Sequence, residues 1–198
     1  MKRNLLFDLD GTLTDPSLGI TNSVMFALRR YGIEETDRKK LCSFIGPPLV
    51  ESFETYYGFP RERGYEATGY FQEYFAQKGI FENRLYPGIP EMLRNLREKG
   101  FQILLCTSKP EEFATRILSH FHLDPYFDRV CGATMDERER SSKKDVIRYA
   151  LEKSGIDPKE SVMIGDRALD VLGARAFGIA TVGVLYGFGS REEMIACG

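Results

Sequence analysis

The sequence has few cysteines, and none of them lies close to another. The four, Cys42, Cys106, Cys131 and Cys197, form no C-x-x-C pair. Cys106 and Cys131 lie within apolar runs, where cysteine usually serves as a small hydrophobic core residue. We therefore expect reduced, structural thiols and a cytoplasmic location.

The sequence also lacks a long apolar run and a strong charge of either sign. No apolar stretch approaches the roughly 18 residues that predict a transmembrane helix, and Met1–Asn4 leads into the first apolar run without the apolar region of a signal peptide. The 27 basic and 29 acidic residues are mixed along the chain and leave a net charge of -2. We therefore expect neither a membrane nor a nucleic-acid polymer as partner; the pattern indicates no oligomeric state.

Apolar runs alternate with amphipathic segments over the C-terminal part of the chain. After a first strand at residues 4–7, we expect strands at residues 101–107, 129–132, 161–165 and 180–184. Helical patterns separate them, at residues 91–99, 111–121, about 143–151 and 168–177, and a last helix is expected at 190–196. This alternation predicts an α/β fold, a Rossmann-like three-layer core in which helices cover both faces of a parallel sheet of about five strands.

A stretch without strand signals interrupts this alternation after the first strand. Helices are expected at residues 16–31, 38–44, 49–57 and 61–78. Residues 44–86 hold half of the phenylalanines and tyrosines, which we interpret chiefly as the core of a small helical unit, with one or two facing a substrate as the alternative. The prediction is a core domain of residues 1–15 and 85–198 with an inserted helical cap domain of residues 16–84.

Two aspartates directly follow the first strand. Asp8 and Asp10 point to one side in strand alternation, and Gly11 then allows a sharp turn toward a ligand. Two carboxylates that close repel each other unless a cation or a shared proton intervenes. A helix cap or a glycine turn is the ordinary structural explanation of such a pair.

Other strand ends carry further polar residues. Thr107-Ser108-Lys109 follows the second strand, Lys143 and Lys144 begin the next helix, and Asp166 and Asp170 follow the fourth strand. Each has an ordinary explanation of its own, as a cap, a surface charge or a first-turn acid. The carboxyl ends of parallel strands share one edge of a sheet, however, and several carboxylates beside a hydroxyl and a lysine predict a Mg²⁺ and phosphate site.

These motifs together resemble the haloacid dehalogenase superfamily. Its first motif, Asp-x-Asp-Gly-Thr, is matched by Asp8–Thr12, its second by Thr107, and its fourth, Gly-Asp-x-x-x-Asp, by Gly165–Asp170. The lysine of its third motif is matched by Lys143 in preference to Lys144, on the spacing to the following apolar residues. The four motifs stand in the family's order and cover essentially the whole chain.

The position of the helical insert, right after the first motif, resembles the family's small-cap subclass. Within the insert, Gly19–Ser23 and Gly46–Leu49 are similar to phosphoglycolate-phosphatase-like and 5′-nucleotidase-like members. The resemblance implies a phosphatase for a small phosphorylated metabolite, either phosphoglycolate or a nucleoside 5′-monophosphate.

The resemblance also implies a role for each matched residue. Asp8 would attack phosphorus and form an aspartyl phosphate, and Asp10 would act as general acid and then general base. Thr107, Ser108 and Lys143 would bind the phosphoryl oxygens.

The same resemblance implies Mg²⁺ as the cofactor. Its ligands would be Asp8, the backbone carbonyl of Asp10, Asp166, and Asp170 directly or through water.

The same residues bear on three other activities. A haloacid dehalogenase is disfavoured because its chemistry needs no second aspartate at Asp10. A phosphomutase stays open, since the insert could hold a sugar phosphate for return transfer. A non-catalytic phosphate-binding module is disfavoured because both Asp8 and Asp10 are present.

Overall fold

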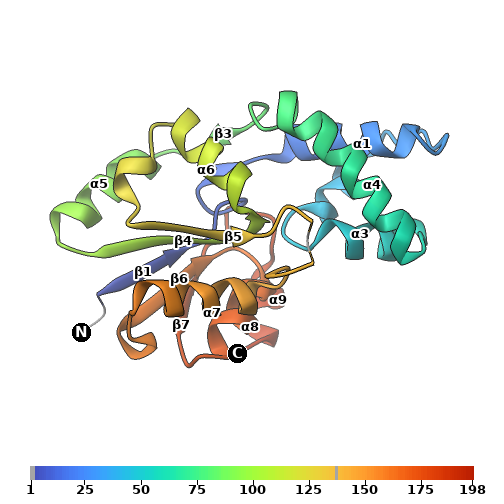
Figure 1. The fold of residues 1–198 in the computed structure, drawn as a ribbon. Helices are drawn as coiled ribbons and strands as arrows, with labels where there is room; N and C mark the ends of the chain where they lie inside the picture. Colours follow the sequence, from blue (N-terminus) through green and yellow to red (C-terminus); the bar gives the residue numbers. More distant parts are fainter. Residues whose placement is uncertain (1–2, 137) are drawn as a thin grey trace.

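A computed structural model describes residues 3–136 and 138–198. Its main sheet has five parallel strands in the order β5-β4-β1-β6-β7 (Figure 1). These strands are β1 (Asn4–Phe7), β4 (Gln102–Pro110), β5 (Arg129–Ala133), β6 (Ser161–Gly165) and β7 (Ala180–Gly183). The first strand in the chain thus lies at the centre of the sheet, and the predicted parallel α/β core is confirmed.

Helices cover both faces of this sheet and make it a three-layer structure (Figure 1). One layer holds α5 (Ile89–Glu98) and α6 (Glu111–His120), the other α7 (Lys143–Ser154) and α8 (Ala168–Arg175). A last helix, α9 (Arg191–Ala196), and the 3₁₀ turns η3 (Asp124–Tyr126) and η4 (Pro158–Glu160) complete this part.

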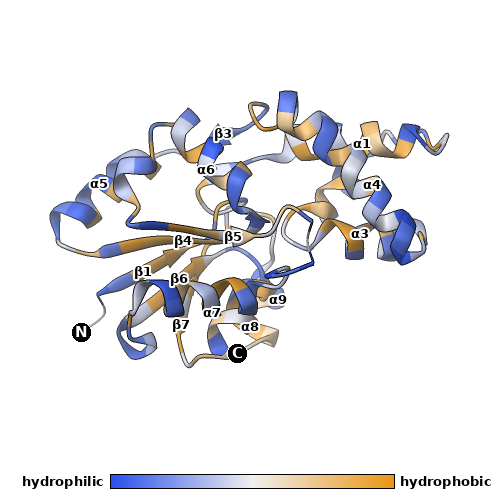
Figure 2. Cartoon of the chain, viewed as in Figure 1, coloured by the Kyte–Doolittle hydropathy of each residue, from blue (hydrophilic) through white to orange (hydrophobic). Residues whose placement is uncertain are grey.

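Successive side chains of each strand point to opposite faces of the sheet, so the hydrophobic core is divided between the two helical layers. Phe7 and Leu105 pack into a cluster that includes residues of α5, α6 and the inserted helices, whereas Leu6 and Leu104 pack against residues of α7 and α8. The strands are therefore apolar on both faces, while the covering helices carry hydrophilic and hydrophobic residues in alternation (Figure 2).

The segment that follows β1 is helical, as its sequence predicts. It contains α1 (Ser17–Arg29), α2 (Arg38–Leu41), the 3₁₀ turn η1 (Cys42–Phe44), α3 (Leu49–Tyr57), α4 (Arg61–Tyr74) and the π-helical turn η2 (Phe75–Gly79). Two short strands that the sequence did not predict frame it, β2 (Thr14–Asp15) and β3 (Arg84–Leu85), which pair antiparallel. The chain therefore enters and leaves this segment side by side.

The predicted helix at 61–78 is not one regular helix. α4 ends at Tyr74, and the π-helical turn that follows lies against α1. A Cβ on Gly19 would lie 2.0 Å from the carbonyl oxygen of Gly79, and a Cβ on Gly79 would lie 2.9 Å from the ring of Phe75. Two glycines thus allow the two backbones to approach closely.

The second predicted strand, residues 101–107, is also longer in the structure. β4 continues to Pro110, which pairs with Ala133 of β5 beyond a shift of register. Lys109 is therefore held within the strand, whereas the sequence placed it after the strand.

We expect Gly19→Ala to lower the free energy of unfolding by about 1–3 kcal/mol, the usual cost of overpacking a filled space. The matched control is Gly69→Ala on the exposed face of α4, where an added Cβ meets nothing within 4 Å. That change should raise the free energy of unfolding by up to about 1 kcal/mol, because alanine is the better helix former. Urea denaturation of both variants measures the difference, and equal effects would contradict the close contact.

Candidate active site

The residues that the sequence placed at the strand ends come together in the structure. Asp8 follows β1, Thr107 lies in β4, and Asp166 follows β6, three neighbouring strands of the sheet. Six of the predicted site residues are almost fully buried: Asp8, Asp10, Thr107, Lys143, Asp166 and Asp170. Ser108 is partly buried and lines the same cavity as Asp8 and Lys143.

Lys143 is the cation at the centre of this group. Its Nζ lies 2.6 Å from Oδ1 of Asp8 and 2.8 Å from Oδ1 of Asp170, and it donates a hydrogen bond to the carbonyl of Cys106 at 3.0 Å. Burial alone would lower the pKa of Lys143, but Asp170 and Asp8 outweigh it and hold this pKa above its usual value. Lys144 is exposed, so of the two candidate lysines Lys143 is the one that reaches the carboxylates.

A second buried lysine pairs with the other aspartate of the first motif. Nζ of Lys109 lies 2.8 Å from Oδ2 of Asp10 and 4.4 Å from the ring centroid of Phe75. Burial raises the pKa of Asp10, although Lys109 opposes the rise. The sequence placed Lys109 just after the second strand, but it gave no sign of this pair.

Three carboxylates form a cluster that suits a divalent cation. Asp8, Asp166 and Asp170 each offer an oxygen, and these oxygens lie within 4.8 Å of one another. Burial, with the nearby charge of Asp8, raises the pKa of Asp166 to about 7. Burial also raises the pKa of Asp170 to about 6, against the opposing charge of Lys143. Crowded, buried carboxylate oxygens are the ligands that Mg²⁺ prefers, so the donor set fits that ion.

Residues of the loop after β1 and of the segment after β7 hold Asp166 in place. The backbone N–H of Phe188 donates to Oδ2 of Asp166 at 2.7 Å, and the hydroxyl of Thr12 donates to Oδ1 at 3.4 Å. A Cβ on Gly11, which has φ +85°, would lie 2.2 Å from Asp166, and one on Gly187 would lie 2.4 Å away. The glycines near the C-terminus, which the sequence left unassigned, therefore make room for a site carboxylate.

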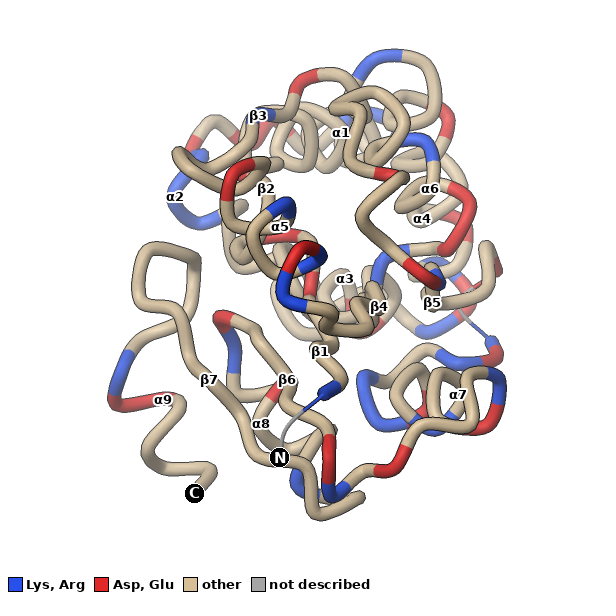
Figure 3. Tube along the Cα trace, turned by 90° about the vertical axis from the view of Figure 1, so that its left-hand side faces the viewer, with Lys and Arg blue, Asp and Glu red and all other residues tan. Residues whose placement is uncertain are grey.

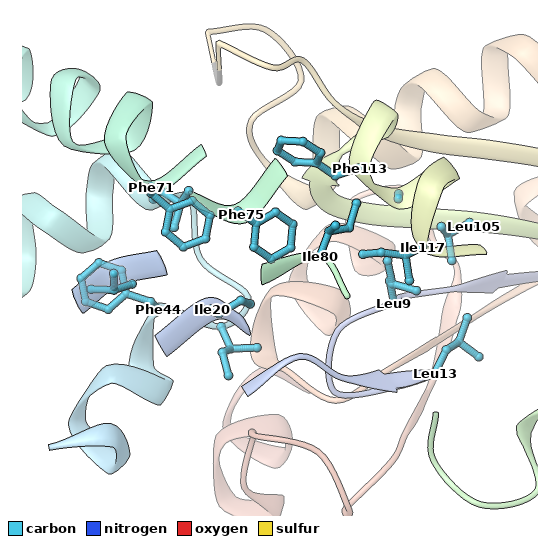
Figure 4. Packing of buried hydrophobic residues seen from close by; sticks show 14 of the residues in the cluster. Leu9, Leu13, Ile20, Phe44, Phe71, Phe75, Ile80, Leu105, Phe113 and Ile117 are labelled. Atoms are coloured by element: carbon cyan, nitrogen blue, oxygen red, sulfur yellow. The ribbon is translucent and has the colours of Figure 1, made fainter. Parts of the chain in front are cut away.

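A cavity separates these polar groups from the inserted helices. Its polar side includes Asp8, Thr107 and Lys143. The side that the insert provides is mainly apolar and includes Ile20, Phe44, Leu49, Phe71 and Phe75. Figure 4 shows Phe71 and Phe75 beside Phe113 of α6, and the ring centroids of Phe75 and Phe113 lie 5.2 Å apart.

Arg167 links the two sides of this cavity. Its Nη1 donates a hydrogen bond to the carbonyl of Ile45 in the inserted segment, and its Nε lies 3.0 Å from Oε1 of Glu193. Glu193 also accepts a hydrogen bond from the backbone N–H of Ala168, at the start of α8. The loop before α3 is thereby tied to the loop that carries Asp166.

Acidic and basic residues are interspersed along the described chain, as Figure 3 shows. No helix among residues 3–136 and 138–198 is both long and apolar enough to cross a membrane.

Comparisons with known proteins give consistent likenesses. Residues 5–184 match the haloacid dehalogenase-like hydrolase family. The chain is 47% identical to a 5′-nucleotidase of Pseudomonas aeruginosa, over 98% of this chain and 87% of that protein. It is 28% identical to a phosphoglycolate phosphatase of Vibrio vulnificus, over 97% and 87%.

One further relative and one solved structure are also similar to this chain. The chain is 38% identical to the tyrosine-protein kinase PtkA of Mycobacterium tuberculosis, over 95% of this chain but 64% of that protein. The crystal structure of a predicted phosphatase from Clostridium acetobutylicum matches with a TM-score of 0.97 and 45% identity, over 100% of this chain and 91% of that one.

We expect the carboxylate cluster to make stability depend on pH in the metal-free protein. The pKa of Asp166, about 7, lies above its ordinary value of 3.8, so the folded state binds more protons than the unfolded state between those pH values. The contribution of Asp166 to stability is therefore present below about pH 4 and is lost as the pH rises through about 7. Asp166→Asn, which cannot ionise, should gain stability relative to the unchanged protein over this range.

Thermal unfolding in EDTA across the pH range measures this difference. Added Mg²⁺ should stabilise the unchanged protein more at about pH 8 than at about pH 5, because protons and the cation compete for the same oxygens. If the difference in thermal stability between Asp166→Asn and the unchanged protein does not vary with pH, the raised pKa assigned to Asp166 is wrong.

Proposed function

This chain belongs to the haloacid dehalogenase-like hydrolase family, and from that premise we propose that it is a Mg²⁺-dependent phosphatase acting on a small phosphomonoester. The observation that carries the proposal is the buried group of Asp8, Lys143 and Asp170 at the carboxyl edge of the parallel sheet. A nucleophile, a cation and an acidic cluster within one cavity are the parts that phosphoryl transfer needs.

Asp8 is the proposed nucleophile. One oxygen of its carboxylate attacks phosphorus while the bond from phosphorus to the leaving-group oxygen breaks, which gives an aspartyl phosphate and a free alcohol. Lys143 holds Oδ1 of Asp8 at 2.6 Å, which leaves the other oxygen for the attack. Thr107, Ser108 and Lys143 bind the transferring phosphoryl oxygens and offset their charge.

Asp10 is the proposed acid and base. It lies in the same cavity as Asp8, gives a proton to the departing oxygen, and then takes a proton from the water that hydrolyses the aspartyl phosphate. This returns both aspartates to their starting state. When bound, Mg²⁺ would be held by Asp8, the Asp10 carbonyl, Asp166 and Asp170, and would offset the charge of the phosphoryl group.

The inserted helices are the proposed source of substrate choice. Their aromatic residues at the cavity, Phe44, Phe71 and Phe75, suit a flat and largely apolar leaving group. The 47% identical relative is a 5′-nucleotidase, so a nucleoside 5′-monophosphate is the favoured substrate and phosphoglycolate the second candidate.

We expect Asp8→Asn to lower the Mg²⁺-dependent hydrolysis of p-nitrophenyl phosphate by a factor of about 10³ or more, because it removes the nucleophile. The matched control is Asp124→Asn, the same change at an exposed aspartate in the η3 turn, which should keep full activity. Release of nitrophenol measures both variants. Equal rates for Asp8→Asn and the unchanged protein would rule out the proposed mechanism.

We expect kcat/KM for a nucleoside 5′-monophosphate to exceed that for phosphoglycolate by about tenfold or more, since an aromatic base buried in the cavity contributes at least about 1.4 kcal/mol. Phosphate release from a panel of both classes measures the ratio. A preference for phosphoglycolate would make the small carboxylate the better candidate, and transfer of the phosphoryl group to a sugar instead of water would indicate a phosphomutase.

A further inference from the structure

Lys109 lies between Asp10, the proposed general acid and base, and the inserted helices. Its side chain is 6% exposed, its Nζ lies 2.8 Å from Oδ2 of Asp10, and the same atom lies 4.4 Å from the ring centroid of Phe75. A buried ammonium group needs a counter-charge, and an aromatic face stabilises it further. Asp10 and Phe75 supply these two partners from different parts of the chain.

The two oxygens of Asp10 have unequal surroundings. Oδ2 is paired with Lys109, whereas Oδ1 is buried and has no hydrogen-bond partner among the described residues. Asp10 also lines the cavity that holds Asp8. The pairing therefore orients the carboxyl group and leaves Oδ1 as the oxygen without a partner among the described residues.

Lys109 and Phe75 are both fixed by packing. The backbone N–H of Lys109 donates to the hydroxyl of Thr107 at 3.2 Å, and a Cβ on Gly132 of β5 would lie 2.6 Å from the Lys109 carbonyl oxygen. Phe75 begins the π-helical turn, and its ring stacks on Phe71 with centroids 5.4 Å apart (Figure 4). Lys109 is thus confined from the sheet side and from the insert side.

We propose that Lys109 is a positioning residue: it holds Oδ2 of Asp10 so that Oδ1 faces the leaving-group oxygen, and Phe75 keeps Lys109 in that place when the insert covers the cavity. This inference rests on the proposed phosphatase function. It makes protonation of the leaving group depend on a contact from the inserted helices, so the acid is oriented when the cavity is covered.

The test compares two substrates of nearly the same shape, phenyl phosphate and p-nitrophenyl phosphate. Phenol is the weaker acid, so its departure depends more on a proton from Asp10. We expect Lys109→Met to lower kcat/KM for phenyl phosphate by about tenfold or more and that for p-nitrophenyl phosphate by less than about threefold, a part of the 10²–10⁴ that general acid catalysis supplies. Loss of a phosphate contact or of folded protein would lower both equally.

Phe75→Leu provides a second, independent variant that keeps an apolar side chain. It should shift the ratio of the two kcat/KM values in the same direction by a smaller factor, since the Lys109–Asp10 pair persists without the ring. If Lys109→Met does not fold, this variant alone decides. An unchanged ratio in the folded variants would overturn the proposal.

Two control variants make the comparison specific. Lys78→Met removes a lysine that also lies over an aromatic ring of the insert, that of Tyr74 at 5.9 Å. Phe53→Leu trims a fully buried ring of the insert that packs on Phe44 and Phe59. Neither should change the ratio, and a change as large as that of Lys109→Met would overturn the proposal. If the unchanged protein shows no Asp8-dependent hydrolysis of either substrate, the proposed function itself fails.

Discussion

Repulsion among four buried carboxylates is the constraint on which the site depends. Asp8, Asp10, Asp166 and Asp170 lie at one edge of the sheet, and Lys143 and Lys109 are the lysines paired with them. Burial, and after it the nearby charge of Asp8, raises the pKa values of Asp166 and Asp170. Such a group persists because it is assembled from the ends of adjacent parallel strands, whose backbones are fixed by the whole core.

The parts of this arrangement that the sequence predicts are those set by strand order and local pattern. Apolar runs located the strands, and residues just after them, such as Asp8 and Asp166, had to meet at one edge. The Lys109–Asp10 pair and the cradle of Gly187 around Asp166 could not be predicted, because they depend on contacts between segments far apart in the chain. The π-helical turn that begins at Phe75 was missed for a related reason: it ends at Gly79, which lies against Gly19 of a segment far away in the chain.

The two sides of the cavity differ in chemistry: one is polar and the other is mainly apolar. The sheet edge carries the charged and hydroxyl groups to which we assign the phosphoryl chemistry, whereas the inserted helices present mainly apolar side chains. Arg167 and Lys109 cross this division, one toward the carbonyl of Ile45 and the other toward Phe75. A change in the apolar wall can therefore alter which alcohol is accepted while the phosphoryl chemistry is kept.

The antiparallel pairing of β2 and β3 has a consequence for how such proteins diversify. Thr14 pairs with Leu85 and Asp15 with Arg84, so the two ends of the insert are neighbours. A helical unit of different size or shape can be inserted between β2 and β3 without altering the register of the central strands. Evolution can then replace one inserted helical unit with another while the α/β core stays unchanged.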